Sequence, residues 1–198
     1  MAFSRVQIIS YALTLMGRKP VSSLVNQGDI VTSADQAFDL LLTSALSIGF
    51  WRFATTIATL QKLPETPVGG YWMYSYMLPA NYLKMVHLYP HTYDFELYSN
   101  SRLYSNYNNQ YQPLYIEHIY LPSETLLPPY FVKYFSFELA AYLALSNAQA
   151  PDYLAELERR RAIELSIAQA ADAQNRPQSP LMSKPMLECR YVSTFAGG

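Results

Sequence analysis

The feature that most constrains the fold is a change in hydrophobic spacing at two points of the chain. Up to Gly49, and again after Pro128, apolar residues recur every three or four positions, which is the spacing of an amphipathic helix. Between these points, short apolar and aromatic segments alternate with prolines and glycines, which is typical of strands joined by turns. The chain is therefore expected to place helices on either side of a β-rich region.

Signals at the helix ends sharpen this prediction. Ser4 is placed to cap a first helix that should run to about Met16. Ser33, with Gln36 three residues later, has the pattern of a capping box and predicts the start of a second helix ending at Gly49. The third and fourth helices are expected over residues 130–147 and 152–174.

The predicted fold class is mainly α with a β-insert (α+β). It consists of a four-helix bundle, a tyrosine-rich antiparallel β insertion between helices two and three, and an extended C-terminal tail. The tail is expected because three prolines interrupt it and no helical spacing survives there. The expected regions are residues 1–50 (helices one and two), 51–127 (β-rich insert), 128–174 (helices three and four) and 175–198 (tail).

Tyrosine is unusually abundant, with 18 copies that lie mostly between Tyr71 and Tyr134. This residue suits strands, and it is enriched at interfaces because it combines a large contact area with a polar end. A half-buried sheet and a surface for subunit or partner contact are both open interpretations. Strands are expected at residues 55–60, 72–77, 83–89, 95–98 and 114–120, with residues 99–112 forming a hairpin with an extended tip.

Three motifs occur in a fixed order along the chain. The block Gly49-Phe50-Trp51-Arg52-Phe53-Ala54 follows the second predicted helix, and a tyrosine-rich segment ending at Leu78-Pro79 comes next. The third predicted helix carries the aromatic and alanine pattern Phe135-Ser136-Phe137-Glu138-Leu139-Ala140-Ala141-Tyr142. In this order, over nearly the full chain, the motifs resemble the head-to-tail adaptor family of short-tailed bacteriophages, also called the tail tubular protein A family.

The resemblance implies a structural connector in the virion, made in the host cytoplasm, and not an enzyme. Subunits would form a ring of twelve below the portal protein, continue the DNA channel and dock the tail nozzle. The implied partners are the portal, the nozzle, the other adaptor subunits and genome DNA that passes without sequence-specific binding. No cofactor and no membrane contact are expected.

The composition is compatible with an associating protein. Only 15% of residues are charged and the net charge is −1, so no overall field attracts nucleic acid. No apolar run reaches the length of a transmembrane helix, and the N-terminus lacks the apolar segment of a signal peptide. Cys189 is the only cysteine, which rules out an intrachain disulfide framework.

Two groups of residues are candidates for contacts with partners. The run Arg159-Arg160-Arg161 either pairs locally with Glu156 and Glu164 on a solvated helix face, or contacts an acidic neighbouring subunit or DNA in the channel. The C-terminal segment of the family reaches toward the portal, so apolar tail residues are expected to anchor there. These residues are Leu181, Met182, Met186, Leu187 and Phe195.

A third candidate is the aromatic junction formed by Trp51 and Phe53. The two residues alternate, so in an extended segment they would share one face. That face is expected to close the end of the helical bundle.

No catalytic or metal site is expected. His87 and His91 have the spacing of two metal ligands on a helix, but Pro90 favours a strand there. A carboxylate pair from the β-rich region could serve a glycosidase. The alternative function is therefore a carbohydrate-binding or polysaccharide-degrading virion component. The carboxylates concerned are Asp94, Glu96, Glu117 and Glu124.

Overall fold

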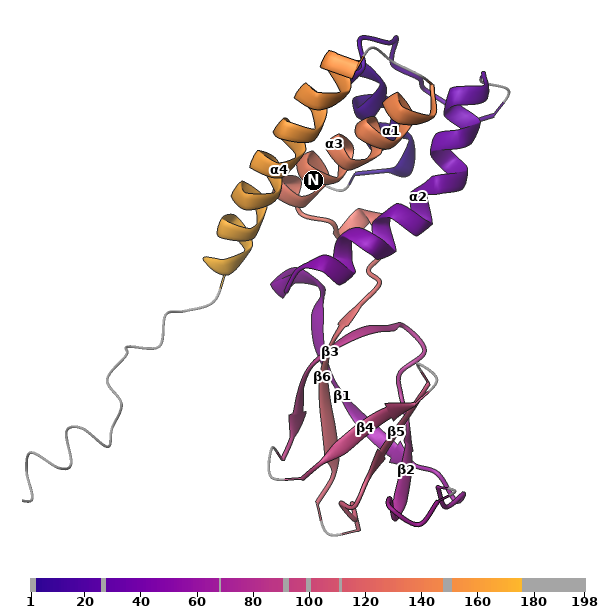
Figure 1. The fold of residues 1–198 in the computed structure, drawn as a ribbon, viewed down its shortest axis with the longest axis vertical. Coiled ribbons are helices and arrows are strands. Elements are labelled where there is room, and N and C mark those ends of the chain that lie inside the picture. The colour runs from indigo at the N-terminus through magenta and orange to yellow at the C-terminus, as the bar shows by residue number, and fades with distance from the viewer. Residues whose placement is uncertain are drawn as a thin grey trace, which may run out of the picture.

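The computed structural model describes residues 3–25, 28–67, 69–90, 93–98, 101–110, 112–147 and 151–175. In Figure 1 the α-helices of this described part gather in the upper half and its strands in the lower half. We call these the helical part and the sheet part. The elements are α1 (Arg5–Leu15), α2 (Asp29–Ile48), η1 (Arg52–Ala54), β1 (Thr55–Lys62), β2 (Tyr74–Met77), β3 (Tyr82–Tyr89), β4 (Phe95–Tyr98), β5 (Arg102–Ser105), β6 (Leu114–Tyr120), η2 (Glu124–Leu126), α3 (Pro129–Ser146) and α4 (Pro151–Ala173).

The predicted four-helix bundle with an insert is wrong. α3 lies at the centre of the helical part, and α1, α2 and α4 each pack mainly against it. The reason is that α3 is apolar around most of its circumference, so that it accepts neighbours on several sides. α4 is mostly polar and buries only Leu157, Ala168 and Asp172 among its described side chains.

The β-rich region is one six-stranded antiparallel sheet in the order β3-β6-β1-β2-β5-β4, curled into a half-barrel. Register shifts after Tyr82 and Met85 interrupt the β3–β6 pairing, and such irregularities bend a sheet. Because the sheet curls, its concave face encloses a core of its own. That core contains Leu60, Tyr76, Leu78, Leu88, Leu103, Tyr107, Leu114 and Ile116.

Of the two helix starts predicted from capping residues, the structure confirms one and contradicts the other. Ser4 caps α1 as predicted: its hydroxyl accepts a hydrogen bond from the Gln7 amide, while the Gln7 side chain accepts one from the Ser4 amide. The predicted start of α2 at Ser33 is wrong, since the helix already begins at Asp29 after Gly28. Ser33 lies inside α2 and donates to the Asp29 carbonyl. An acidic residue in the first turn suits the positive end of the helix dipole.

Candidate functional site

The end of the helical core that faces the sheet is filled by Trp51. Its side chain is fully buried, and Nε1 donates a hydrogen bond of 3.0 Å to the carbonyl of Ala45. The indole meets the ring of Phe131 edge-on, with 4.9 Å between centroids. Gly49 is required locally, because a Cβ at that position would lie 3.0 Å from the Trp51 Nε1 atom. α2 therefore ends where the indole needs space.

Phe53 reaches the same aromatic cluster, but not by strand alternation. Residues Arg52–Ala54 form the short helix η1 instead of the predicted extended segment. From this turn the Phe53 ring lies 5.0 Å from Phe131 and 5.9 Å from Trp51, measured between ring centroids. The structure thus brings both predicted junction residues together, through a tight turn.

A buried carboxylate next to this cluster was not found by sequence reasoning. Asp172, in the last turn of α4, accepts hydrogen bonds from the amides of Arg52 and Phe53 and from the Tyr130 hydroxyl. These amides open η1 and have no partner within that helix. Burial, with the bond to Asp172, raises the pKa of Tyr130, which keeps the phenol protonated as a donor. The end of α4 is thereby tied to the start of the sheet part.

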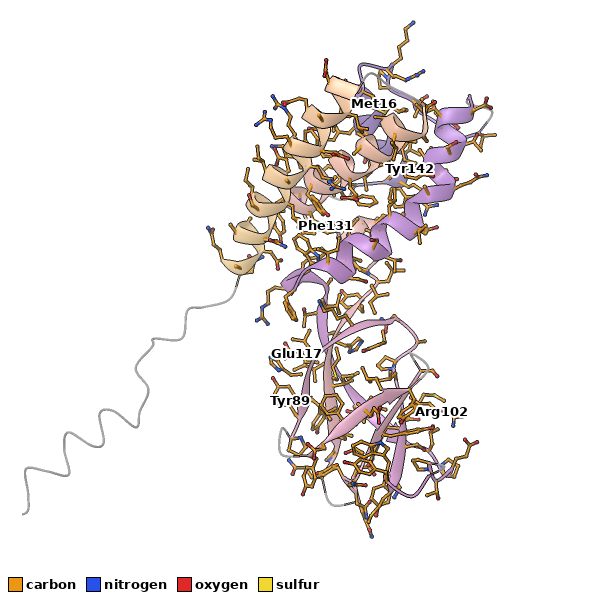
Figure 2. The ribbon with its side chains drawn as sticks, in the orientation of Figure 1. Met16, Tyr89, Arg102, Glu117, Phe131 and Tyr142 are labelled. Carbon is orange, nitrogen blue, oxygen red and sulfur yellow. The ribbon has the colours of Figure 1, made fainter. Side chains whose placement is uncertain are left out.

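A second polar contact crosses the same boundary. The Arg52 guanidinium of η1 lies 3.5 Å from the Glu117 carboxylate of β6. Within the sheet, the Tyr89 hydroxyl of β3 also donates to Glu117, over 3.1 Å. Lys84 of β3 donates to the carbonyl of Ser47 in α2. Figure 2 shows Phe131 in the helical part, with Glu117 and Tyr89 below it in the sheet. Together with the aromatic cluster, these contacts join the two parts into one body.

The arginine run on α4 is paired with carboxylates. Arg159 and Arg160 both bind Glu156, with nitrogen–oxygen distances of 2.8 and 2.7 Å. Hydrogen bonds from these two guanidinium groups lower the pKa of Glu156 to about 2. Arg161 instead binds Glu138 of α3 over 3.2 Å. Because one carboxylate serves two cations, the group Glu156, Arg159 and Arg160, which we call the basic cluster, carries a formal charge of 2 − 1 = +1.

The other expected partner of the run, Glu164, pairs elsewhere. Its carboxylate lies 2.7 Å from the Lys133 ammonium of α3. Glu164 and Glu138 therefore hold α4 against α3, whereas the basic cluster lies on an exposed side of α4.

An acidic counterpart lies at the junction of α1, α2 and η2. The Arg5 guanidinium binds Asp35, Asp39 and Glu124, and it stacks over the Phe38 ring at 4.4 Å from the centroid. Three carboxylates share one cation, so this acidic cluster carries a formal charge of 1 − 3 = −2. The local sequence carries no signal for it, because the partners come from distant segments.

Large apolar side chains are exposed on both parts of the molecule. Single exposed residues of this kind are ordinary. On the outer face of the sheet, Ile57 and Thr59 of β1 alternate to the same side, and Thr59 pairs with Tyr115 of β6, so Ile57 and Tyr115 are diagonal neighbours. The exposed residues include Leu40, Ile48, Leu126, Leu145, Ile163 and Ile167 of the helical part, and Ile57, Tyr71, Met73, Met77 and Tyr115 of the sheet part.

The structure does not gather the four candidate carboxylates of a glycosidase. Glu117 faces Arg52, Glu124 belongs to the acidic cluster, and Glu96 accepts from Trp72 and Tyr98 at the outermost strand. The side chain of Asp94 is in none of these contacts, although its carbonyl accepts a hydrogen bond from Ser105.

The predictions on metal ligands, membrane contact and the tail can be compared with the described residues only in part. Among the described histidines, cysteines, aspartates and glutamates, no group of three is placed as metal ligands would be. Of the predicted histidine pair, His87 lies on strand β3, and His91 lies outside the described residues. In the described part of the chain, no helix is both long and apolar enough to cross a membrane. The predicted portal anchors also lie outside the described residues: Leu181, Met182, Met186, Leu187 and Phe195.

Comparison with known proteins does not place the chain in a family. No protein-family model matches it, and no curated protein matches it.

Proposed function

We propose that this protein is a head-to-tail connector of a short-tailed phage virion. Twelve copies form a ring below the portal protein, continue the DNA channel and dock the tail nozzle. The observation that carries the proposal is the buried junction around Trp51 and Asp172, which joins the unlike helical and sheet parts into one body with exposed apolar surface on each part. A connector needs this property, because it must hold different partners at a fixed separation.

The chemistry of the surfaces supports this role. Low overall charge and exposed apolar side chains favour stable contacts between proteins. The proposed role is structural and not enzymatic, and the candidate carboxylates of the sheet part each have other partners or lie apart.

The tail from residue 177 onward is proposed as the portal anchor. Its apolar residues are Leu181, Met182, Met186, Leu187 and Phe195. A segment that becomes ordered on binding loses chain entropy, so a single copy binds weakly. Twelve copies on a twelvefold portal act together and bind strongly. The free protein is therefore expected to be monomeric or weakly associated, and the ring to form on the portal.

The test is sedimentation of the purified chain with the portal protein encoded in the same genome. Cosedimentation with the portal is expected, and a chain lacking residues 177–198 should lose it while keeping its circular dichroism spectrum. If the full chain does not bind the portal but remains monomeric and binds glycans on an array, the connector is excluded in favour of the carbohydrate-binding alternative.

A further inference from the structure

The two outer helices lie on opposite flanks of α3. On one side, the Phe38 ring of α2 meets the Phe135 ring of α3 with 5.1 Å between centroids. On the other side, Lys133 of α3 binds Glu164 of α4. Figure 1 shows α2 at the right edge of the helical part and α4 at its left edge. Each helix therefore has a side that faces away from the rest of the chain.

The outer side of α4 joins the basic cluster to exposed apolar residues. Glu156, Arg160, Ile163 and Ile167 follow each other at intervals of four, three and four residues, which is one face of a helix. Ile163 and Ile167 are 43% and 51% exposed. We call this stripe the α4 face.

The outer side of α2 has the same apolar character with the opposite charge. Leu40 is 74% exposed, the most exposed of the large apolar side chains in the described part of the chain. Asp39 of the acidic cluster, one position earlier and therefore about 100° around the helix from Leu40, lies on the flank of α2 beside α1, and its side chain is 72% exposed. The residues of α2 include three aspartates and no lysine or arginine. We call Leu40 and Asp39, with the acidic cluster beside them, the α2 face.

The charges decide which faces can meet. Two α2 faces would bring acidic clusters of charge −2 together, and two α4 faces would bring basic clusters together, so both symmetric contacts are repulsive. An α2 face against an α4 face pairs −2 with +1 and places Leu40 near Ile163 and Ile167. Such complementarity selects the partner and its orientation more than it adds affinity.

We propose that the α4 face of one copy binds the α2 face of the next copy, in a head-to-tail contact. A contact between two different faces repeats from copy to copy, and it closes into a ring when the rotation between neighbours allows. The inference rests on the proposed function only for that closure; the contact itself follows from the two faces.

Cross-linking with cysteine variants tests the contact even where association is weak. In a Cys189→Ser background, copies with Leu40→Cys are mixed with isotopically labelled copies carrying Ile163→Cys and treated with a short bis-maleimide. Mixed dimers should exceed each homodimer by about fivefold, because like faces repel. A chain with both cysteines should give a ladder of oligomers. Leu145→Cys, exposed on neither face, replaces Leu40→Cys in the control mixture.

Mixed dimers at the yield of the Leu145→Cys control would overturn the proposal, and so would a preference for Leu40→Cys homodimers. A charge exchange gives a second test: Asp39→Lys and Arg160→Glu should each shorten the ladder of the double-cysteine chain, and mixing the two variants should restore it. Failure of restoration contradicts the pairing of these two faces. Portal sedimentation is measured separately, so portal binding without the cross-linking preference removes this interface but leaves the connector function in place.

Discussion

The helical part and the sheet part are stabilised in different ways. The helical core is built from rings that meet directly, with Trp51, Phe131 and Phe135 almost free of solvent. In the sheet part, polar groups of the core bind the backbone of loops: the Tyr76 hydroxyl donates to the Tyr107 carbonyl, and the Ser105 hydroxyl donates to that of Asp94. The comparison indicates that apolar packing supplies the stability of the helices, whereas hydrogen bonds hold the loops of the half-barrel in place.

The largest effect is expected at the boundary between the two parts. Trp51→Ala removes a fully buried indole and the hydrogen bond to the Ala45 carbonyl, and should lower the free energy of unfolding by about 3–5 kcal/mol. Urea unfolding followed by circular dichroism measures the loss. The neighbouring Phe50→Ala is the control: its ring is exposed and contacts the Lys84 ammonium, so the cost should be about 0.5–1 kcal/mol. Equal effects of the two substitutions would show that Trp51 does not close the core.

Asp172 tests whether the two parts depend on each other. Asp172→Ala leaves the amides of Arg52 and Phe53 and the Tyr130 hydroxyl without their acceptor, at a cost of about 2–4 kcal/mol. Asp152→Ala, at the exposed start of the same helix, should cost less than about 1 kcal/mol. Urea unfolding gives both values, and a loss at Asp172 no greater than at Asp152 would mean that the buried carboxylate does not hold the junction.

Trp51 and Asp172 show which features of the fold could be predicted from the sequence and which could not. The first three helices were predictable from their apolar spacing, and the fourth from its high content of alanine, glutamate and arginine. Trp51 stood out because it follows a glycine that ends a helix. The packing around α3 was not predictable, since spacing reveals an apolar face but not which neighbour covers it. Asp172 is one acid among several on a polar helix, and its partner Arg52 is 120 residues away.

The sheet was only partly predictable, because local alternation can indicate a strand but not the distant strand with which it pairs. Strands β1, β3, β4 and β6 lie close to where alternating residues predicted them. β5 lies within the predicted hairpin of residues 99–112 but was not predicted as a strand of its own, because Arg102–Ser105 gives only two alternations within a segment rich in serine and asparagine. The order β3-β6-β1-β2-β5-β4 depends on pairing between distant segments, such as β1 with β6, which no local pattern encodes.

A smaller effect, dependent on pH, is expected within the sheet part. His118 of β6 is buried, and neither ring nitrogen has a hydrogen-bond partner. Burial lowers its pKa, so the unfolded chain binds a proton more readily than the folded one. The free energy of unfolding is therefore not reduced by this group above the unfolded histidine pKa of about 6.5. As the pH falls below that value, the free energy of unfolding decreases by up to about 1.4 kcal/mol per pH unit.

His118→Leu should remove this loss of stability, which denaturant titrations at pH 7 and pH 5 would show. His87→Leu, an exposed histidine on β3, controls for the loss of an imidazole and should keep the acid sensitivity due to His118. An unchanged difference between the two pH values in the His118→Leu chain would contradict a buried neutral imidazole.

The smallest effect is expected on the outer side of the helical part. Glu156→Gln removes the carboxylate shared by Arg159 and Arg160, and exposed ion pairs of this kind contribute little to stability. The melting temperature at pH 7 should not change measurably. The pKa of Glu156 is lowered to about 2, whereas a glutamate in the unfolded chain has a pKa of about 4.3. The wild-type ion pairs therefore contribute fully above pH ~4.3 and weaken only as the pH falls toward 2. A marked drop in melting temperature at pH 7 would assign the basic cluster to folding instead of to contact with a partner.

The connector function itself is tested most directly by counting the copies bound to one portal. Native mass spectrometry of the portal ring with an excess of the chain gives that number. The proposal predicts twelve added copies, bound together over a narrow range of concentration because neighbours contact each other on the ring. A portal ring that gains no mass at high concentrations of the chain would contradict the connector function.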